Sequence, residues 1–359
     1  MENPAQVIQT TLASQNMNIR QNLPTNNALR QVIKRARHDQ LPKEPIDLDH
    51  LYFDTPFTET LTGEQFLAGA IDVDGKSLIF TTVQNLRHLC HASSIFCDGT
   101  FKVVPRLFTQ LFTLHVAIGG SDETKRILPV VYCLMERKTK KSYIAVFARI
   151  KWLTEFYGLE LDPDNIISDF EIGAINAAQE VFPEANMQGC MFHLSQSIYR
   201  HVKQEGLQNR YTTDLNFQFL VKQLSALAFL PANKIKRAYL QLKQLFDNEA
   251  VELLIWFETY YVLGKLRLNG TRSQPQFPPA LWSVYTRQVN SQPRTTNAVE
   301  SWHHHFAKLI GTAHVGIFKC SLPYNVNKQI WKTSLKELLQ VNHDPTVALQ
   351  KHAKYAFLM

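Results

Sequence analysis

The sequence predicts an α/β fold, in which a mixed five-stranded sheet with helices is interrupted by an all-helical insertion. Strand-like segments occur first in an unbroken run of three and then alternate with segments of helical periodicity. A later stretch, starting near residue 211, has helical periodicity and no strand pattern. Consecutive strands favour an antiparallel meander, whereas alternating strands and helices need parallel pairing with right-handed crossovers.

The meander is expected at residues 95–101, 108–118 and 127–135. Pro105-Arg106 and Gly119-Gly-Ser-Asp122 separate these strands. In the second strand, large or β-branched residues alternate with others, which is typical of a half-buried strand. These residues are Phe112, Leu114, Val116 and Ile118.

Alternating units follow the meander. A helix is expected at residues 142–157, because an apolar stripe recurs there at helical spacing and would face a sheet. The stripe consists of Tyr143, Val146, Phe147, Ile150 and Leu153. The sequence then predicts a strand at 165–169, a helix at 171–182, a strand at 187–190 and a helix at 194–205.

A lead-in segment precedes the meander. Two short strands, at 66–70 and 77–80, are expected around the turn Asp72-Val-Asp-Gly75, and a helix at 83–91 is expected to be capped by Thr81 or Thr82. We interpret Asp72 and Asp74 as turn residues rather than metal ligands.

These patterns divide the chain into consecutive segments. They are an N-terminal basic helix and linker (1–50), the lead-in subdomain (51–93), the first part of the core (94–210), the helical insertion and return loop (211–296), the last core helix (297–312) and a C-terminal helical tail (313–359). The basic cluster Arg30-Gln-Val-Ile-Lys-Arg-Ala-Arg37 in the first segment is either a solvated helix face or a contact to a DNA backbone.

Composition narrows the class of protein. The chain has 359 residues, is 45% hydrophobic and 19% charged, and carries a formal net charge of +7, which favours a polyanionic partner. Its five cysteines have no regular spacing and predict reduced thiols in a cytosolic or nuclear protein. The N-terminus has no signal-peptide pattern, and no apolar run is long enough to span a bilayer.

Three acids carry the candidate chemistry. Asp98 follows an apolar strand segment, Asp169 ends the fourth core strand and Glu300 lies near the start of a later helix. If the first and fourth core strands are neighbours, Asp98 and Asp169 lie at the same edge of the sheet, where open α/β sheets commonly place sites. Oxygen-only ligands indicate Mg²⁺ or Mn²⁺, and two such ions can catalyse phosphodiester displacement.

Four motifs in this order resemble the MULE (Mutator-like element) transposase domain over about residues 55–310. The motifs are Phe96-Cys-Asp-Gly-Thr-Phe-Lys102, Ile167-Ser-Asp-Phe-Glu171, Gly189-Cys-Met-Phe-His-Leu194 and Thr296-Asn-Ala-Val-Glu-Ser-Trp-His303. The resemblance implies an RNase H-like fold and a catalytic DDE triad of Asp98, Asp169 and Glu300. With two Mg²⁺ or Mn²⁺ ions, such a triad cleaves a strand at the element's end, and the freed 3′-hydroxyl attacks target DNA. It also implies DNA transposition in the nucleus, transposon ends and target DNA as partners, and a homo-oligomer.

The pair Cys190 and His193 matches the family's Cys-x-x-His motif. One interpretation is half of a zinc site, completed by His201 or by the run His303-His-His305. The other is a buried thiol and a hydrogen-bonded histidine close to the catalytic sheet, and we favour it because a closed zinc site needs more ligands.

Further residues are candidate DNA contacts. The basic candidates are Lys102, Arg106, Lys138, Lys140, Lys141 and Arg294. Trp302 is either a base-stacking residue or, as we favour, a core residue. His304 is four residues after Glu300, a spacing that would let it face the site. The interpretation that we favour is a partly exposed run, His303-His-His305, that binds phosphate or has no particular role. A helix N-terminus favours an acidic residue in any case. This accounts for Glu171, which we therefore leave out of the triad.

One feature departs from longer family members, which carry a zinc-binding DNA-recognition domain before the catalytic one. No cysteine precedes Cys90 here, so we expect that module to be absent. The chain is then a truncated gene model, a fragment of a longer product or a domesticated relative. The alternative function is a domesticated, transposase-derived DNA-binding or transcription/chromatin protein without catalysis. A decaying, non-functional copy is a third interpretation.

Overall fold

The computed structural model describes residues 8, 24–39, 42–60, 62–101, 103–119, 126–289, 297–310 and 316–318. The chain divides into two compact units. The first comprises the described parts of 1–65, 103–107 and 309–359, and the second comprises those of 66–102 and 108–308. All three candidate acids belong to the second unit.

The first unit contains helices α3 (Asn26–Asp39) and α4 (Thr55–Thr58). Helix α3 confirms the helix expected around the basic cluster. Within this unit, the ring of Phe318 packs edge-on against Phe53 and Phe57, with centroid separations of 5.9 and 4.9 Å. The backbone N–H of Ile317 donates to Glu44 at 2.8 Å. Residues 319–359, most of the predicted tail, lie outside the described residues.

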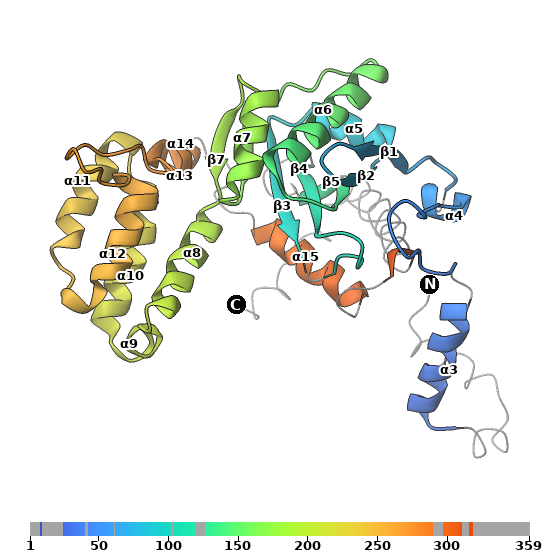
Figure 1. Ribbon diagram of the computed structural model, residues 1–359, viewed down its shortest axis with the longest axis horizontal. Coiled ribbons are helices and arrows are strands. Elements are labelled where there is room, and N and C mark those ends of the chain that lie inside the picture. The colour runs from blue at the N-terminus through green and yellow to red at the C-terminus, as the bar shows by residue number, and fades with distance from the viewer. Residues whose placement is uncertain are drawn as a thin grey trace, which may run out of the picture. The chain divides into compact units, whose positions relative to one another are not determined.

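A mixed sheet of seven strands forms the centre of the second unit within the part of the chain that the structure describes (Figure 1). The strands are β1 (Leu67–Asp72), β2 (Lys76–Phe80), β3 (Ser94–Thr100), β4 (Gln110–Ile118), β5 (Arg126–Met135), β6 (Asn165–Ser168) and β7 (Asn186–Gly189). Their order in the sheet is β1-β2-β5-β4-β3-β6-β7.

The predicted sheet of five strands is therefore too small. The two lead-in strands, β1 and β2, pair antiparallel with each other, and β2 pairs antiparallel with β5. This pairing gives partners to the backbone groups of β5 that a five-stranded sheet would leave at an edge. The remaining order is as predicted, because β3, β4 and β5 form an antiparallel meander whereas β3, β6 and β7 are parallel.

Helices connect and extend these strands. Their bounds are α5 (Val83–Cys90), α6 (Lys140–Phe156), α7 (Ile172–Val181), α8 (Met191–Gln204), α9 (Gln208–Thr213), α10 (Leu215–Ala226), α11 (Ala232–Lys243), α12 (Val251–Phe257), α13 (Pro279–Trp282), α14 (Tyr285–Val289) and α15 (Asn297–Ile310), with the short 3₁₀ turns η1 (Leu227–Phe229) and η2 (Asn248–Ala250) and the π-helical turn η3 (Glu258–Val262). Thr82 caps α5, as predicted, by accepting a hydrogen bond from the backbone N–H of Asn85.

Different helices cover the two faces of β4. On one face, Phe112 packs against α6, with its ring centroid 5.0 Å from that of Tyr143 and 5.9 Å from that of Phe147. On the other face, Thr113 and His115 contact side chains of α15. The strand is consequently buried on both faces along most of its length, rather than half-buried as its alternation indicates.

The chain after α8 is helical through η3, which agrees with the predicted helical insertion. The predicted return loop differs, because it contains the short helices α13 and α14. Pro279 suits the first turn of α13, where a missing N–H costs no hydrogen bond. Trp282 in that helix is fully buried, and its indole N–H is 3.1 Å from the backbone oxygens of both Tyr261 and Phe277. None of the described helices has the length and apolar character needed to cross a membrane.

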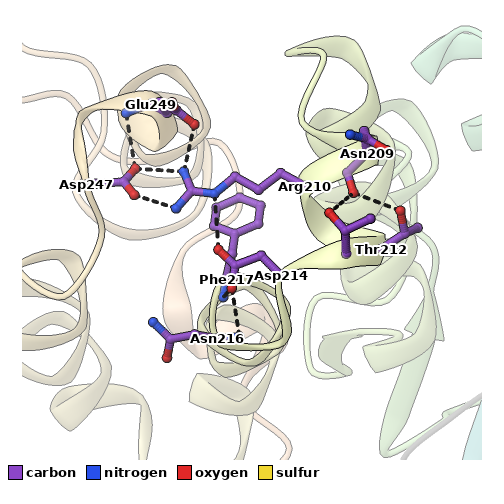
Figure 2. A network of polar contacts seen from close by, with 9 residues as sticks. Asn209, Arg210, Thr212, Asp214, Asn216, Phe217, Asp247 and Glu249 are labelled. Atoms are coloured by element: carbon purple, nitrogen blue, oxygen red, sulfur yellow. Dashed lines mark hydrogen bonds and ion pairs between the residues drawn. The ribbon is translucent and has the colours of Figure 1, made fainter.

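Arg210 links three parts of the helical insertion (Figure 2). Its guanidinium forms a two-pronged ion pair with Asp247 and contacts Glu249 at 3.0 Å and Asp214 at 3.4 Å. It also lies over the ring of Phe217, 4.4 Å from the centroid. Because Asp214 caps α10 and Asp247 precedes η2, a single side chain on α9 fixes both connections.

Candidate functional site

Asp98 and Asp169 lie on neighbouring parallel strands. Strands β3 and β6 pair in parallel, and Cys97 lies opposite Ser168. Asp98 is the next residue on β3, and Asp169 directly follows β6. The two carboxylates therefore emerge at the same edge of the sheet, as the sequence predicts for adjacent strands.

Local hydrogen bonds orient these two carboxylates. The Oδ1 atom of Asp98 accepts from the backbone N–H of Gly99 at 2.9 Å. The Oδ1 atom of Asp169 accepts from the hydroxyl of Ser168 at 3.3 Å and from the backbone N–H of Glu171 at 3.2 Å. Asp98 within β3 and Asp169 just after β6 are thus each held by neighbours in their own sequence motif.

Glu300 belongs to the first turn of α15. The preceding residue, Val299, is fully buried in a small apolar cluster with Phe96, Ile167 and Cys190. That cluster joins α15 to β3, β6 and the start of α8. Apolar packing therefore holds the helix on the sheet face from which the two aspartates emerge.

His193 lies among the three acids, in the first turn of α8. Its Nε2 atom is 4.0 Å from Asp98 Oδ1 and 3.6 Å from Glu300 Oε1. Burial acts to lower the pKa of His193, but a hydrogen bond with Cys190 and the charges of Asp98 and Asp169 outweigh it and raise the pKa to about 9. The imidazole is therefore positively charged at neutral pH and partly balances the acids.

The environment of Asp98 disfavours its ionised form. Burial raises the pKa of Asp98 to about 7, with further upward contributions from Asp169 and Glu300, while His193 acts in the opposite direction. Burial likewise raises the pKa of Glu300. Crowded, buried carboxylates with raised pKa values are typical of sites that need a cation or a shared proton.

His303, which the sequence interpretation named only as a possible zinc ligand, contacts Asp98 and belongs to this site. Its Nδ1 atom lies 3.3 Å from Asp98 Oδ2, and its Nε2 atom lies 3.1 Å from Thr113 Oγ1. His304 and His305 are exposed, as the favoured interpretation of a partly exposed histidine run expects. The burial of Val299 sets the rotation of α15, and this brings His303 rather than its neighbour to the sheet.

The Cys-x-x-His motif belongs to the same site. Cys190 is fully buried directly before α8, and His193 faces the acids. The buried Cys190 matches one part of the favoured interpretation, and the role of the pair stays a prediction. The described residues contain no group of three or more His, Cys, Asp or Glu side chains arranged to hold a metal ion, zinc included.

The candidate DNA contacts have different surroundings. Lys102 and Arg294 lie outside the described residues, and Arg106 is exposed in the first unit. Trp302 stacks on Phe306 at 4.9 Å and contacts His115 at 5.3 Å, which agrees with the favoured core role.

Two of the candidate lysines already have acidic partners. Lys138 contacts Glu171 at 3.0 Å, and Lys140 contacts Glu180 at 2.7 Å. Glu171 precedes α7 at its N-cap position, as expected, and its carboxylate is paired. The pairing of Glu171 with Lys138 is therefore consistent with leaving Glu171 out of the predicted triad.

The chemical type of the donor atoms suits a hard divalent cation, although the three acids are not spaced to enclose one in this structure. All three acids offer oxygen, and Glu300 Oε1 is buried with no hydrogen-bond partner among the described residues. Mg²⁺ and Mn²⁺ prefer such oxygen ligands. A cation at these acids would also favour the ionised form of Asp98, which burial opposes.

Residues 94–197 match the family model of the MULE transposase domain. The match confirms the resemblance on which the sequence interpretation relies. It includes two of the three acids, Asp98 and Asp169, together with Cys190 and His193, and ends before Glu300. No curated protein matches the chain.

Proposed function

We propose that this chain is the core of a Mutator-like DDE transposase that cleaves and joins DNA phosphodiester bonds. The observation that carries the proposal is that His193 lies between Asp98 and Glu300, with Asp169 at the end of the strand next to that of Asp98. The family match supports a transposase-related function and interaction with DNA. The meander followed by parallel units supports the RNase H-like fold that the resemblance implies.

In this proposal Asp98, Asp169 and Glu300 hold Mg²⁺ or Mn²⁺, two ions in the active complex. Bound there, the ions would activate water or a 3′-hydroxyl and stabilise the leaving oxygen. Asp98 and Asp169 are fixed by strand ends, so their separation is set by the sheet. Glu300 comes from a packed helix, so its position depends on the cluster around Val299.

His193 has an electrostatic role in the proposed mechanism. Its raised pKa keeps a proton on the imidazole that faces Asp98 and Glu300. This positive charge reduces the repulsion between the acids and an approaching DNA phosphate. The net charge of +7 assists the same approach at longer range. DNA as substrate implies a nuclear location, and pairing of two DNA ends implies a homo-oligomer.

A plasmid-nicking assay tests the proposal. The purified chain should convert supercoiled DNA to the nicked form in Mg²⁺ or Mn²⁺ and should not do so in EDTA. Asp98→Ala, Asp169→Ala and Glu300→Ala should each abolish nicking, whereas Glu184→Ala, which removes an exposed acid, should not.

Two results would contradict the proposal. Nicking that persists in all three acid variants would show that a different site or a contaminant acts. A chain that binds DNA in a gel-shift assay but never nicks it would favour the alternative of a domesticated DNA-binding protein.

A further inference from the structure

A polar network lies behind Asp98, inside an otherwise apolar layer between the sheet and α15. Thr113 and His115 on β4 are fully buried, and the side chain of His303 is 12% exposed. His115 Nε2 is 2.8 Å from Thr113 Oγ1, and His303 Nε2 is 3.1 Å from the same oxygen. The other ring nitrogen of His303 faces Asp98 Oδ2 at 3.3 Å. Burying such groups is costly unless their hydrogen bonds are made.

When Asp98 is ionised, the available protons determine which atom donates and which accepts at each contact of this network. The 3.3 Å contact between His303 Nδ1 and Asp98 Oδ2 is an ion-pair distance. For it to become a hydrogen bond to an ionised carboxylate, which only accepts, His303 must carry its proton on Nδ1. The Nε2 atom of neutral His303 is then an acceptor, and Thr113 must donate to it. Thr113 has a single hydroxyl proton, so His115 Nε2–H donates to the hydroxyl oxygen.

A competing arrangement exists and has a different consequence. The Thr113 hydroxyl is also 3.2 Å from the backbone oxygen of Asp98. If it donates there, His303 must donate to Thr113 from Nε2, and a neutral His303 then has no proton on Nδ1. The contact with Asp98 would require a protonated carboxyl group, which is a poor ligand for a cation.

We propose that His303 is a positioning residue for Asp98: it donates from Nδ1 to the carboxylate and fixes its second oxygen for metal binding, while Thr113 and His115 hold His303 in that tautomer. The inference rests on the proposed function, because it concerns the same acids. Hydrogen bonds to metal-binding groups commonly matter almost as much as the ligands themselves.

Titration of Mn²⁺ into the full chain, followed by the electron paramagnetic resonance of unbound Mn²⁺, measures the affinity. His303→Ala should weaken Mn²⁺ binding by about 10–100-fold. His303→Asn should retain most of the affinity, because its amide nitrogen can occupy the position of Nδ1. Thr113→Val should weaken binding less than His303→Ala. His305→Ala, an exposed histidine on the same helix, is the matched control and should bind as the unsubstituted chain does.

A second readout does not depend on activity or on metal affinity. Nitrogen-15 spectra of histidine-labelled protein distinguish the two imidazole tautomers. With Mg²⁺ present, His303 should carry its proton on Nδ1, and Thr113→Val should change the tautomer populations. Thermal unfolding identifies any variant that loses affinity only because it does not fold.

The outcomes separate this inference from the proposed function. Normal Mn²⁺ affinity in His303→Ala, with binding lost in Asp98→Ala, would overturn the positioning role and leave the metal site intact. An Nε2–H tautomer in the presence of Mg²⁺, or a folded His303→Asn that binds as weakly as His303→Ala, would overturn it as well. An unsubstituted chain that binds no Mn²⁺ would contradict the proposed function and this inference together.

Discussion

The Nε2 atom of His193 lies 3.6 Å from the Oε1 atom of Glu300. One residue belongs to the Cys-x-x-His motif and the other to a helix that follows the whole helical insertion. Their contact places that motif at the candidate active site and gives it a charge-balancing role in the absence of metal. Several predictions depend on this charge balance and on the packing that maintains it.

Replacing Asp98 by Asn should stabilise the metal-free fold at neutral and alkaline pH. The pKa of Asp98 in the fold, about 7, exceeds the ordinary value of 3.8, so the folded state binds this proton more tightly than the unfolded state. The stability that results is present below pH 4 and is lost as pH rises through 7. In EDTA, Asp98→Asn should avoid this loss and exceed the unsubstituted chain at pH 8 by a few kcal/mol, on the order of 1–4, because tenfold in proton affinity is worth about 1.4 kcal/mol.

Denaturant unfolding at pH 4.5 and pH 8 measures this difference. The gain from Asp98→Asn should grow with pH across that range. A variant that is equally stable or less stable than the unsubstituted chain at pH 8 would show that the fold does not disfavour the ionised carboxylate.

Replacing His193 by Gln should have the opposite effect in EDTA. The pKa of His193 in the fold, about 9, exceeds the ordinary value of 6.5. Its protonation therefore stabilises the fold fully below pH 6.5, and this contribution disappears as pH rises through 9. His193→Gln keeps a polar side chain of similar length but removes the charge. It should lower stability by on the order of 1–3 kcal/mol at pH 6.

Thermal unfolding at pH 6 and pH 10 checks this prediction, with His305→Gln as the control for a lost histidine on the surface. The deficit of His193→Gln should shrink towards zero at pH 10. A deficit of the same size at both pH values would indicate lost packing rather than lost charge.

Val299→Ala should impair the site without changing any charge. Val299 is fully buried in the cluster that holds α15 on the sheet, so truncation leaves a cavity directly beside Glu300. We expect a loss of stability of about 2 kcal/mol and a fall in nicking rate in conditions where the variant is still folded. Val289→Ala, at an exposed valine of α14, is the control. If Val299→Ala is measurably destabilised but nicks DNA at an unchanged rate, the packing of this cluster does not determine the position of Glu300.

Arg210 should stabilise the helical insertion through its geometry as well as its charge. Arg210→Ala should lower the melting temperature by several degrees, and Arg210→Lys should recover only part of that loss. A lysine keeps the charge but cannot form the two-pronged contact with Asp247 (Figure 2). The effect should be smaller in high salt. Lys222→Ala, at a lysine with a single exposed hydrogen bond, is the comparison; equal melting temperatures for Arg210→Ala and this variant would refute the role.

Local patterns were sufficient to locate much of the fold. The pattern of strands and helices predicted parallel pairing, and it placed Asp98 and Asp169 at one edge on the condition that their strands are adjacent, which the pairing of β3 with β6 meets. The cap of α5 was predicted as Thr81 or Thr82 from residue type and position before a periodic segment, and the structure shows that it is Thr82. These features depend on residues close together in the chain.

Features that depend on distant contacts were not predictable in the same way. The pairing of β2 with β5 joins segments whose own sequences do not specify a partner, so the sheet was expected to be smaller. Thr113 and His115 occupy alternate positions in β4 that resemble a solvent face, but α15 covers them. The choice of His303 over His304 depends on the rotation of α15, which the packing of Val299 determines.

Calorimetric titration of Mg²⁺ and Mn²⁺ into the purified chain tests the central claim most directly, because it needs no knowledge of the DNA sequence recognised. The account predicts binding that strengthens as pH rises through 7, when Asp98 loses its proton, and that Asp98→Ala, Asp169→Ala and Glu300→Ala each weaken while Glu184→Ala does not. Binding that is absent, or that is indifferent to all three acids, would contradict the claim that these side chains form a metal site.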